Sequence, residues 1–138
     1  KLFQKLTGGG IYQLNSKMNM EKNNNAQKLR SLITLELIGI TFIRDYIQFL
    51  FEEPLLNIYT LPQVKILDKV LQFYQNGYYD KLCSLIGKTV IDAYENNDNL
   101  VIKFEGEIEL QISLKLEDRS TVEAAMLRLG ASSQWTIW

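Results

Sequence analysis

The triplet Gly87-Lys88-Thr89 ends the phosphate-binding loop of many nucleotide enzymes, in which backbone amides and a lysine hold the phosphates. The complete loop has another glycine about five residues earlier, but position 82 of this chain is Leu82. A helix should follow the loop, whereas Val90-Ile91 is β-branched and typical of a strand. The triplet therefore predicts the end of a short helix that leads into a strand, and no nucleotide site.

Other reactive side chains are scarce. The chain has no histidine, which is the commonest general base and metal ligand in proteins. The single cysteine, Cys83, is predicted to be a buried and unreactive thiol, because no histidine is present to activate it. The acidic residues Asp92, Glu95 and Asp98 lack the spacing of a calcium loop. We therefore expect no catalytic, cofactor-binding or metal-binding residue.

The composition is ordinary for a globular protein. Of 138 residues, 46% are hydrophobic and 22% are charged, with a net charge of −1. A nucleic-acid-binding protein usually has a basic face, and a membrane span needs about 20 apolar residues, so we expect neither partner. One cysteine is typical of a reducing compartment, which favours a cytoplasmic protein. Charge is unevenly placed, since residues 1–34 carry six basic and one acidic residue, and residues 85–120 carry four basic and eight acidic residues.

An internal repeat organises the chain. Shifting the sequence by 53 residues places "KLRSLI" (28–33) on "KLCSLI" (81–86) without a gap. The same shift places Asp45 on Asp98 and Phe51 on Phe104. We therefore predict a duplication, with repeats at about 28–60 and 81–114, each a helical turn followed by a three-stranded antiparallel meander.

The second repeat has the clearer strand pattern. Leu100, Ile102 and Phe104 alternate with more polar residues, which is the period of two of a half-buried strand. The first repeat is almost continuously apolar from Leu35 to Phe51, and by itself would also suit a buried helix. The repeat and the β-branched and aromatic residues of 40–49 favour strands there.

Two helices and a final hairpin complete the prediction. A helix is expected from Pro62 to Gly77, because Val64, Leu67, Val70, Leu71 and Tyr74 recur at helical spacing. Another is expected over about 21–33. Residues 122–129 and 134–138 predict a C-terminal β-hairpin, and residues 1–19 an extension that stands apart as a flexible or non-native segment. The expected fold is α+β, a single domain over residues 20–138.

The aromatic and apolar residues fit two explanations, which are packing in the core and a contact between subunits. Aromatic residues are enriched at protein–protein contacts, and a large apolar patch is unusual on a monomer. The candidate interface residues are Leu50, Leu55, Tyr59, Trp135 and Trp138. We expect a homodimer, with a further protein partner left open.

Four segments together resemble a known pattern: "TFIRDYIQFLFEEPLLNIYTLPQV", "NGYYDKLCSLIGKTV", "NLVIKFEGEIELQISL" and "VEAAML…QWTIW". They resemble a family of small bacterial proteins recorded as hypothetical, which pair two such meanders and end on a Trp-rich strand. The resemblance covers about residues 37–138. It implies a bacterial, cytoplasmic protein, and it implies no activity, cofactor or catalytic residue.

These observations favour a non-enzymatic, self-associating interaction module. Two alternatives stay open. One is a small-molecule-binding protein or an enzyme with a pocket between the repeats, lined by tyrosine and tryptophan. The other is an acidic protein that neutralises a basic partner, as immunity proteins do, through a face formed by Asp92, Glu95, Glu107 and Glu109.

Overall fold

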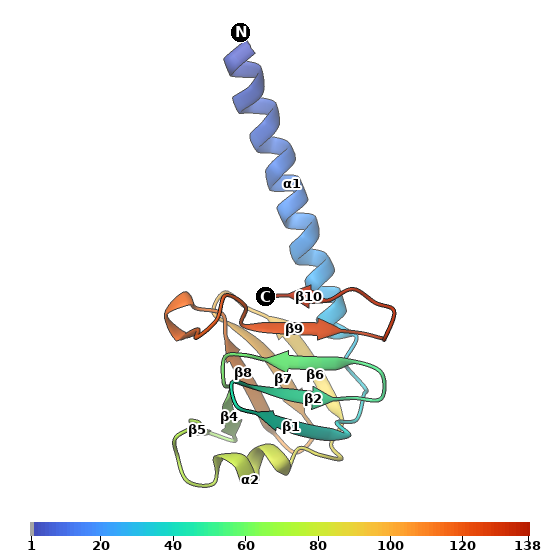
Figure 1. Cartoon of the computed structure of the whole chain (residues 1–138), viewed down its shortest axis with the longest axis vertical. Coiled ribbons are helices and arrows are strands. Elements are labelled where there is room, and N and C mark those ends of the chain that lie inside the picture. Colours follow the sequence, from blue (N-terminus) through green and yellow to red (C-terminus); the bar gives the residue numbers. More distant parts are fainter. Residues whose placement is uncertain (1) are drawn as a thin grey trace.

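The computed structural model describes the backbone of residues 2–138 and the side chains of residues 14–138. The chain begins with a long helix, α1 (Leu2–Arg30), which projects from a body built of two β-sheets (Figure 1). The fold is mixed α+β with two antiparallel sheets of five strands each. The helix predicted to begin near residue 21 thus begins earlier, because no proline occurs before Pro54 to interrupt its hydrogen bonds. The side chains from Leu14 to Met20 are all exposed.

The first sheet contains β1 (Gly39–Ile43), β2 (Tyr46–Leu50), β3 (Leu55–Ile58), β9 (Ala125–Arg128) and β10 (Thr136–Ile137), in that order. Each strand is antiparallel to its neighbour. Residues 39–50, which are apolar enough for a buried helix, therefore form two strands. The chain ends in the antiparallel pair β9–β10, in which Leu127 faces Thr136.

The second sheet has the order β5-β4-β8-β7-β6. Its strands are β4 (Gln63–Ile66), β5 (Lys69–Leu71), β6 (Val90–Glu95), β7 (Asn99–Phe104) and β8 (Ile108–Ser113). A short helix, α2 (Tyr78–Cys83), precedes β6, and a single 3₁₀ turn (Leu116–Asp118) follows β8. The loop between β7 and β8 has Gly106 at φ 87° and Glu107 at φ 60°, the left-handed conformations that a tight hairpin loop uses.

The two sheets pack face to face, and their strands cross at a steep angle (Figure 1). Alternate residues of each strand point into one shared core. From the first sheet the core takes Ile47, Phe49, Leu56, Ile58 and Leu127, and from the second it takes Val64, Leu100, Ile102, Phe104 and Leu110. All ten are at most 2% exposed. Leu29 and Leu32 from the end of α1, and Leu82 and Leu85 from α2 and its following turn, complete the core.

The helix predicted from Pro62 to Gly77 is wrong, because β4 and β5 form a hairpin there. The turn between them places Leu67 at φ 54°, and Leu67 and Tyr74 of the supposed buried stripe are 64% and 73% exposed. The stripe fitted a period of 3.6 only by coincidence. β4 is a strand because it pairs with β8 along residues 63–66, and local periodicity carries no information about so distant a partner.

Two extended segments that precede β1 and β6 join the halves of the chain. Glu36 and Thr89 form an isolated antiparallel bridge. Around it, the amide of Thr34 donates to Val90 O (2.8 Å) and the amide of Gly87 donates to Leu37 O (2.7 Å). Leu37 N also donates to Lys88 O, and Val90 N to Leu35 O. These four hydrogen bonds, together with the bridge, are named the joint below.

The two residues that turn the chain into the joint have the same left-handed backbone, with φ 80° at Thr34 and φ 89° at Gly87. Glycine adopts this conformation without strain, whereas a β-branched residue does not. We expect Gly87→Thr to lower the free energy of unfolding by about 1–2 kcal/mol. A Cβ at Gly87 meets nothing closer than Glu36 Oε1 at 4.0 Å, so the cost is backbone strain and not a clash.

The reverse change, Thr34→Gly, is the matched control. It should leave stability unchanged or raise it, because relief of the strain at least offsets the roughly 0.5–1 kcal/mol entropic cost of glycine. Urea unfolding of both variants measures the difference. Equal losses in the two variants would contradict the assignment of strain to Thr34.

Tyr78 anchors α2 to the segment that crosses between the sheets. Its side chain is 0% exposed, and its hydroxyl donates a 2.6 Å hydrogen bond to Pro62 O. Tyr78→Phe leaves that buried carbonyl without this donor, so we expect a loss of about 1–2 kcal/mol in chemical denaturation. Tyr79→Phe is the control, since Tyr79 is 51% exposed. A loss of similar size in both variants would refute the role of the bond.

Tyr78 also predicts a pH dependence. Burial, and to a lesser degree the neighbouring Tyr79, raises the pKa of Tyr78 above the ordinary value of 10.0. Above about pH 10 the unfolded phenol loses its proton and the folded phenol keeps it, so stability falls as pH rises, by up to about 1.4 kcal/mol per unit from this group. The slope of stability against pH above pH 10 should be shallower in Tyr78→Phe. Identical slopes would show that Tyr78 titrates normally in the folded protein.

Candidate interaction surface

The outer face of the first sheet carries apolar and aromatic side chains towards both ends, with the cross-strand pair Gln48 and Asn57 between them. Alternation places Ile47, Phe49, Leu56 and Ile58 inward, so their neighbours on β2 and β3 point outward. We define the aromatic face as Tyr46, Leu50, Leu55, Tyr59, Met126, Arg128 and Trp135. All seven side chains are half-buried, because neighbours on a sheet shield one another.

One end of the aromatic face is ordered by two tyrosines. The rings of Tyr46 and Tyr59 lie 5.1 Å apart at 40°. The Tyr59 hydroxyl accepts a long hydrogen bond from Asn57 Nδ2 (3.4 Å) and donates to Met126 Sδ (3.6 Å). Strands β2, β3 and β9 are thereby linked on this side, and Tyr59 is fixed in place.

The other end combines leucines with a stacked arginine. Leu50 and Leu55 face each other across β2 and β3, and Leu55 faces Arg128 across β3 and β9. The Arg128 guanidinium lies 5.0 Å from the centre of the Trp135 ring, a cation–π contact. Within residues 14–138, Arg128 forms no ion pair, and its buried Nε has no hydrogen-bond partner.

The structure brings together four of the five residues predicted for an interface. Leu50, Leu55, Tyr59 and Trp135 all belong to the aromatic face. Trp138 does not, because its amide bonds Ala125 O (3.0 Å) and its ring packs against the core.

Sequence reasoning missed three members of the aromatic face. Tyr46 could have been assigned to this face from the sequence, because strand alternation places it on the same side of β2 as Gln48 and Leu50. Met126 and Arg128 were not, because their placement depends on β9 pairing with β3 about seventy residues away.

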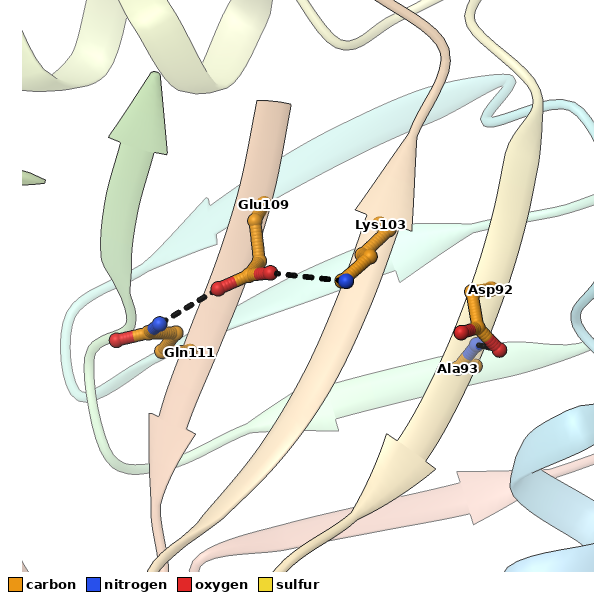
Figure 2. A network of polar contacts seen from close by, with 5 residues as sticks. All are labelled: Asp92, Ala93, Lys103, Glu109 and Gln111. Carbon is orange, nitrogen blue, oxygen red and sulfur yellow. Dashed lines mark hydrogen bonds and ion pairs between the residues drawn. The ribbon is translucent and has the colours of Figure 1, made fainter. Parts of the chain in front are cut away.

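The outer face of the second sheet is polar and internally paired (Figure 2). Lys103 Nζ lies 3.7 Å from Glu109 Oε1, and Gln111 Nε2 donates to Glu109 Oε2 (2.6 Å). Lys103 also lies 5.5 Å from the centre of the Tyr94 ring. The predicted acidic face is interrupted here, because Lys103 stands between Asp92 and Glu109 in the strand register.

The residues first considered for chemistry have structural surroundings. Gly87 follows α2 and leads into β6, as predicted. The Thr89 amide, which a phosphate loop would offer to an anion, donates instead to Glu105 Oε1 (3.1 Å). The prediction that Cys83 is buried is wrong, since it is exposed. The apolar stripe of α2 consists of Tyr78 and Leu82, which turns the adjacent Cys83 outward.

Among the residues described, no cluster of three or more acidic or cysteine side chains has the geometry of a metal site. In the same part of the chain, no helix is both long and apolar enough to cross a membrane. Comparison of the chain with protein-family models, curated proteins and solved structures found no match. The bacterial family suggested by the sequence patterns therefore stays a prediction.

Proposed function

We propose that this protein is a non-enzymatic interaction module that self-associates through the aromatic face. The supporting observation is the contrast between two outer sheet faces of one molecule. On the second sheet, Lys103, Glu109 and Gln111 satisfy one another. On the first, the corresponding area presents tyrosine, tryptophan, methionine and a stacked Arg128, the types that are enriched at interface centres, together with two leucines.

A second copy of the chain is the occupant that best fits this face. In a twofold contact the same surface must complement itself. The unpaired Arg128 lies on the aromatic face, and Glu52 and Glu53 lie exposed in the turn that links Leu50 to Leu55. Neither glutamate forms an ion pair within residues 14–138. An antiparallel pairing of two such faces can place Arg128 of one subunit near this turn of the other.

The area sets the expected strength of the dimer. The aromatic face covers β2, β3, β9 and the position of Trp135, and four strand positions about 4.8 Å apart and roughly 17 Å long cover about 330 Å². A standard interface buries about 800 Å² on each partner, so the aromatic face is small. We therefore expect a reversible dimer with a dissociation constant in the micromolar range.

We also infer that the chain is a duplication that exchanges strands between its halves. Two observations support this inference. The sheet orders β1-β2-β3-β9-β10 and β6-β7-β8-β4-β5 are equivalent. The hydrogen bonds of the joint are also equivalent under the shift of 53 residues, which exchanges Thr34 with Gly87 and Glu36 with Thr89. If the two sheets arose by duplication, their outer faces have equivalent positions in the fold. The difference in polarity between these faces therefore supports a function of the aromatic face in binding. A bacterial, cytoplasmic setting belongs to the same proposal.

Sedimentation velocity from about 1 μM to about 1 mM tests self-association across the range of weak affinities. The wild-type protein should shift from monomer to dimer. Leu55→Glu should stay monomeric with little change in thermal unfolding, because Leu55 is half-buried on an outer face and the new charge would have to be desolvated in the dimer. Ile91→Glu is the control, since Ile91 is an apolar residue of the second sheet that is 56% exposed.

The control should dimerise like the wild type. A wild-type protein that stays monomeric throughout the range would refute self-association. Equal dimerisation of Leu55→Glu and the wild type would refute the assignment to the aromatic face.

A further inference from the structure

A polar hollow of about 640 Å³ lies beside the segment in which the chain passes from β3 to β4. Its lining comes from both halves of the chain, since it includes Tyr59 and Thr60 on one side and Ser113 and Lys115 on the other. The volume falls within the roughly 300–1,000 Å³ of small-molecule sites. No tryptophan lines it, in contrast to the pocket that the sequence suggested.

Uncharged hydrogen-bonding side chains from three neighbouring strands line one side of the hollow. Gln63 on β4 faces Gln111 on β8, and Asn99 on β7 faces Ser113 on β8. Gln111 gives its Nε2 to Glu109, and its Oε1 points away from that carboxylate (Figure 2). Amides and hydroxyls supply both donors and acceptors at short spacing, and hydroxyl groups of a ligand need both.

Two aromatic rings also line the hollow. Phe73 is 48% exposed, although it belongs to a mostly polar surface. Tyr59, which Asn57 and Met126 fix in place, is the second. An exposed ring beside amide groups provides an apolar surface for the C–H groups of a polar ligand.

The charges of the hollow do not favour an anion. Its lining contains Arg44 and Lys115 against Asp45, Asp98 and Asp118. Arg44 already lies 3.9 Å from Asp45, and Asp118 accepts a 2.5 Å hydrogen bond from the Ser113 hydroxyl. A phosphate or a carboxylate would therefore meet more negative than positive side chains.

We propose that the hollow binds a neutral saccharide, with its hydroxyl groups on the Gln63, Gln111 and Asn99 amides and a C–H face of the sugar ring on Phe73. The hollow adjoins the aromatic face, because Tyr59 belongs to both. The proposal of a saccharide site does not depend on self-association through Leu50 and Leu55.

Nuclear magnetic resonance of the ¹⁵N-labelled full chain tests the proposal. Cellobiose, maltose and diacetylchitobiose are titrated to about 10 mM, above the dissociation constants of weak but specific complexes. At least one should shift the side-chain amide signals of Gln63, Gln111 and Asn99 with saturation. Glucose 6-phosphate is the charged probe and should bind no more tightly than the best of these sugars.

Matched variants locate the site. Gln111→Ala and Phe73→Ala should each weaken binding at least about fivefold, as expected for losing one hydrogen bond or one apolar contact. Gln48→Ala is the control for the first, because Gln48 is a half-buried glutamine on the outer face of the other sheet. Phe42→Ala is the control for the second, because Phe42 is an aromatic residue of β1 that is 44% exposed and does not line the hollow.

Three results would overturn the proposal. The first is no saturable shift with any of the three disaccharides. The second is tighter binding of glucose 6-phosphate, which would indicate an anion site. The third is binding that Gln48→Ala or Phe42→Ala weakens as much as the variants in the hollow do. Because the backbone signals also report folding, a variant that unfolds is replaced by Gln63→Ala for the same comparison.

Discussion

The joint is the contact on which the arrangement of the two sheets depends. Its backbone hydrogen bonds tie the segment before β1 to the segment before β6, so that each meander begins from a fixed position relative to the other. Leu37 and Val90 lie within the joint, and their side chains, both 0% exposed, pack into the core. The backbone can enter it only through a left-handed residue on each side, which accounts for Gly87 and for the strained Thr34.

A second constraint is that each sheet takes strands from both ends of the chain. β4 leaves the first meander to pair with β8, and β9 leaves the second meander to pair with β3. Neither five-stranded sheet can therefore form until both halves of the chain are present. The hydrogen bond from Tyr78 to Pro62 O lies on the first of these crossings, and it couples α2 to the path of the chain between the sheets.

The sequence predicted the parts of the fold that depend on local pattern. The alternation of Leu100, Ile102 and Phe104 predicted the side of β7 that faces the core, although Val101 on the other side is also buried. The β-branched and aromatic content around Phe42 and Phe49 correctly favoured strands over a helix. The helix predicted over Pro62–Gly77 was wrong because the local pattern there is ambiguous. In a stretch of only eight residues from Val64 to Leu71, a period of two and a period of 3.6 select overlapping residues, and only the pairing with β8 decides between them.

The residues of the candidate sites also include some that local pattern predicts and some that depend on the pairing of distant strands. Leu55 and Tyr59 could be identified as interface candidates because they belong to a stretch of sequence with more apolar and aromatic residues than one buried face needs. The stacking of Arg128 on Trp135 could not, because it needs the β3–β9 pairing. The residues of the hollow are still harder to predict from the sequence. Nothing distinguishes Gln63 and Gln111 from other surface residues unless the pairing of β4 with β8 is known.

The packing of the core does not explain the aromatic face. The side chains that exclude water between the sheets are on the inner faces, where Phe49, Leu56 and Leu127 are 0% exposed. The outer face of the second sheet shows what such a surface requires, which is cross-strand pairs that satisfy one another, as Lys103 and Glu109 do. Half-buried tyrosines and leucines in that position keep apolar area in contact with water, which opposes solubility. Because polar residues would serve the first sheet equally well, the apolar residues support the proposal of a contact that covers them.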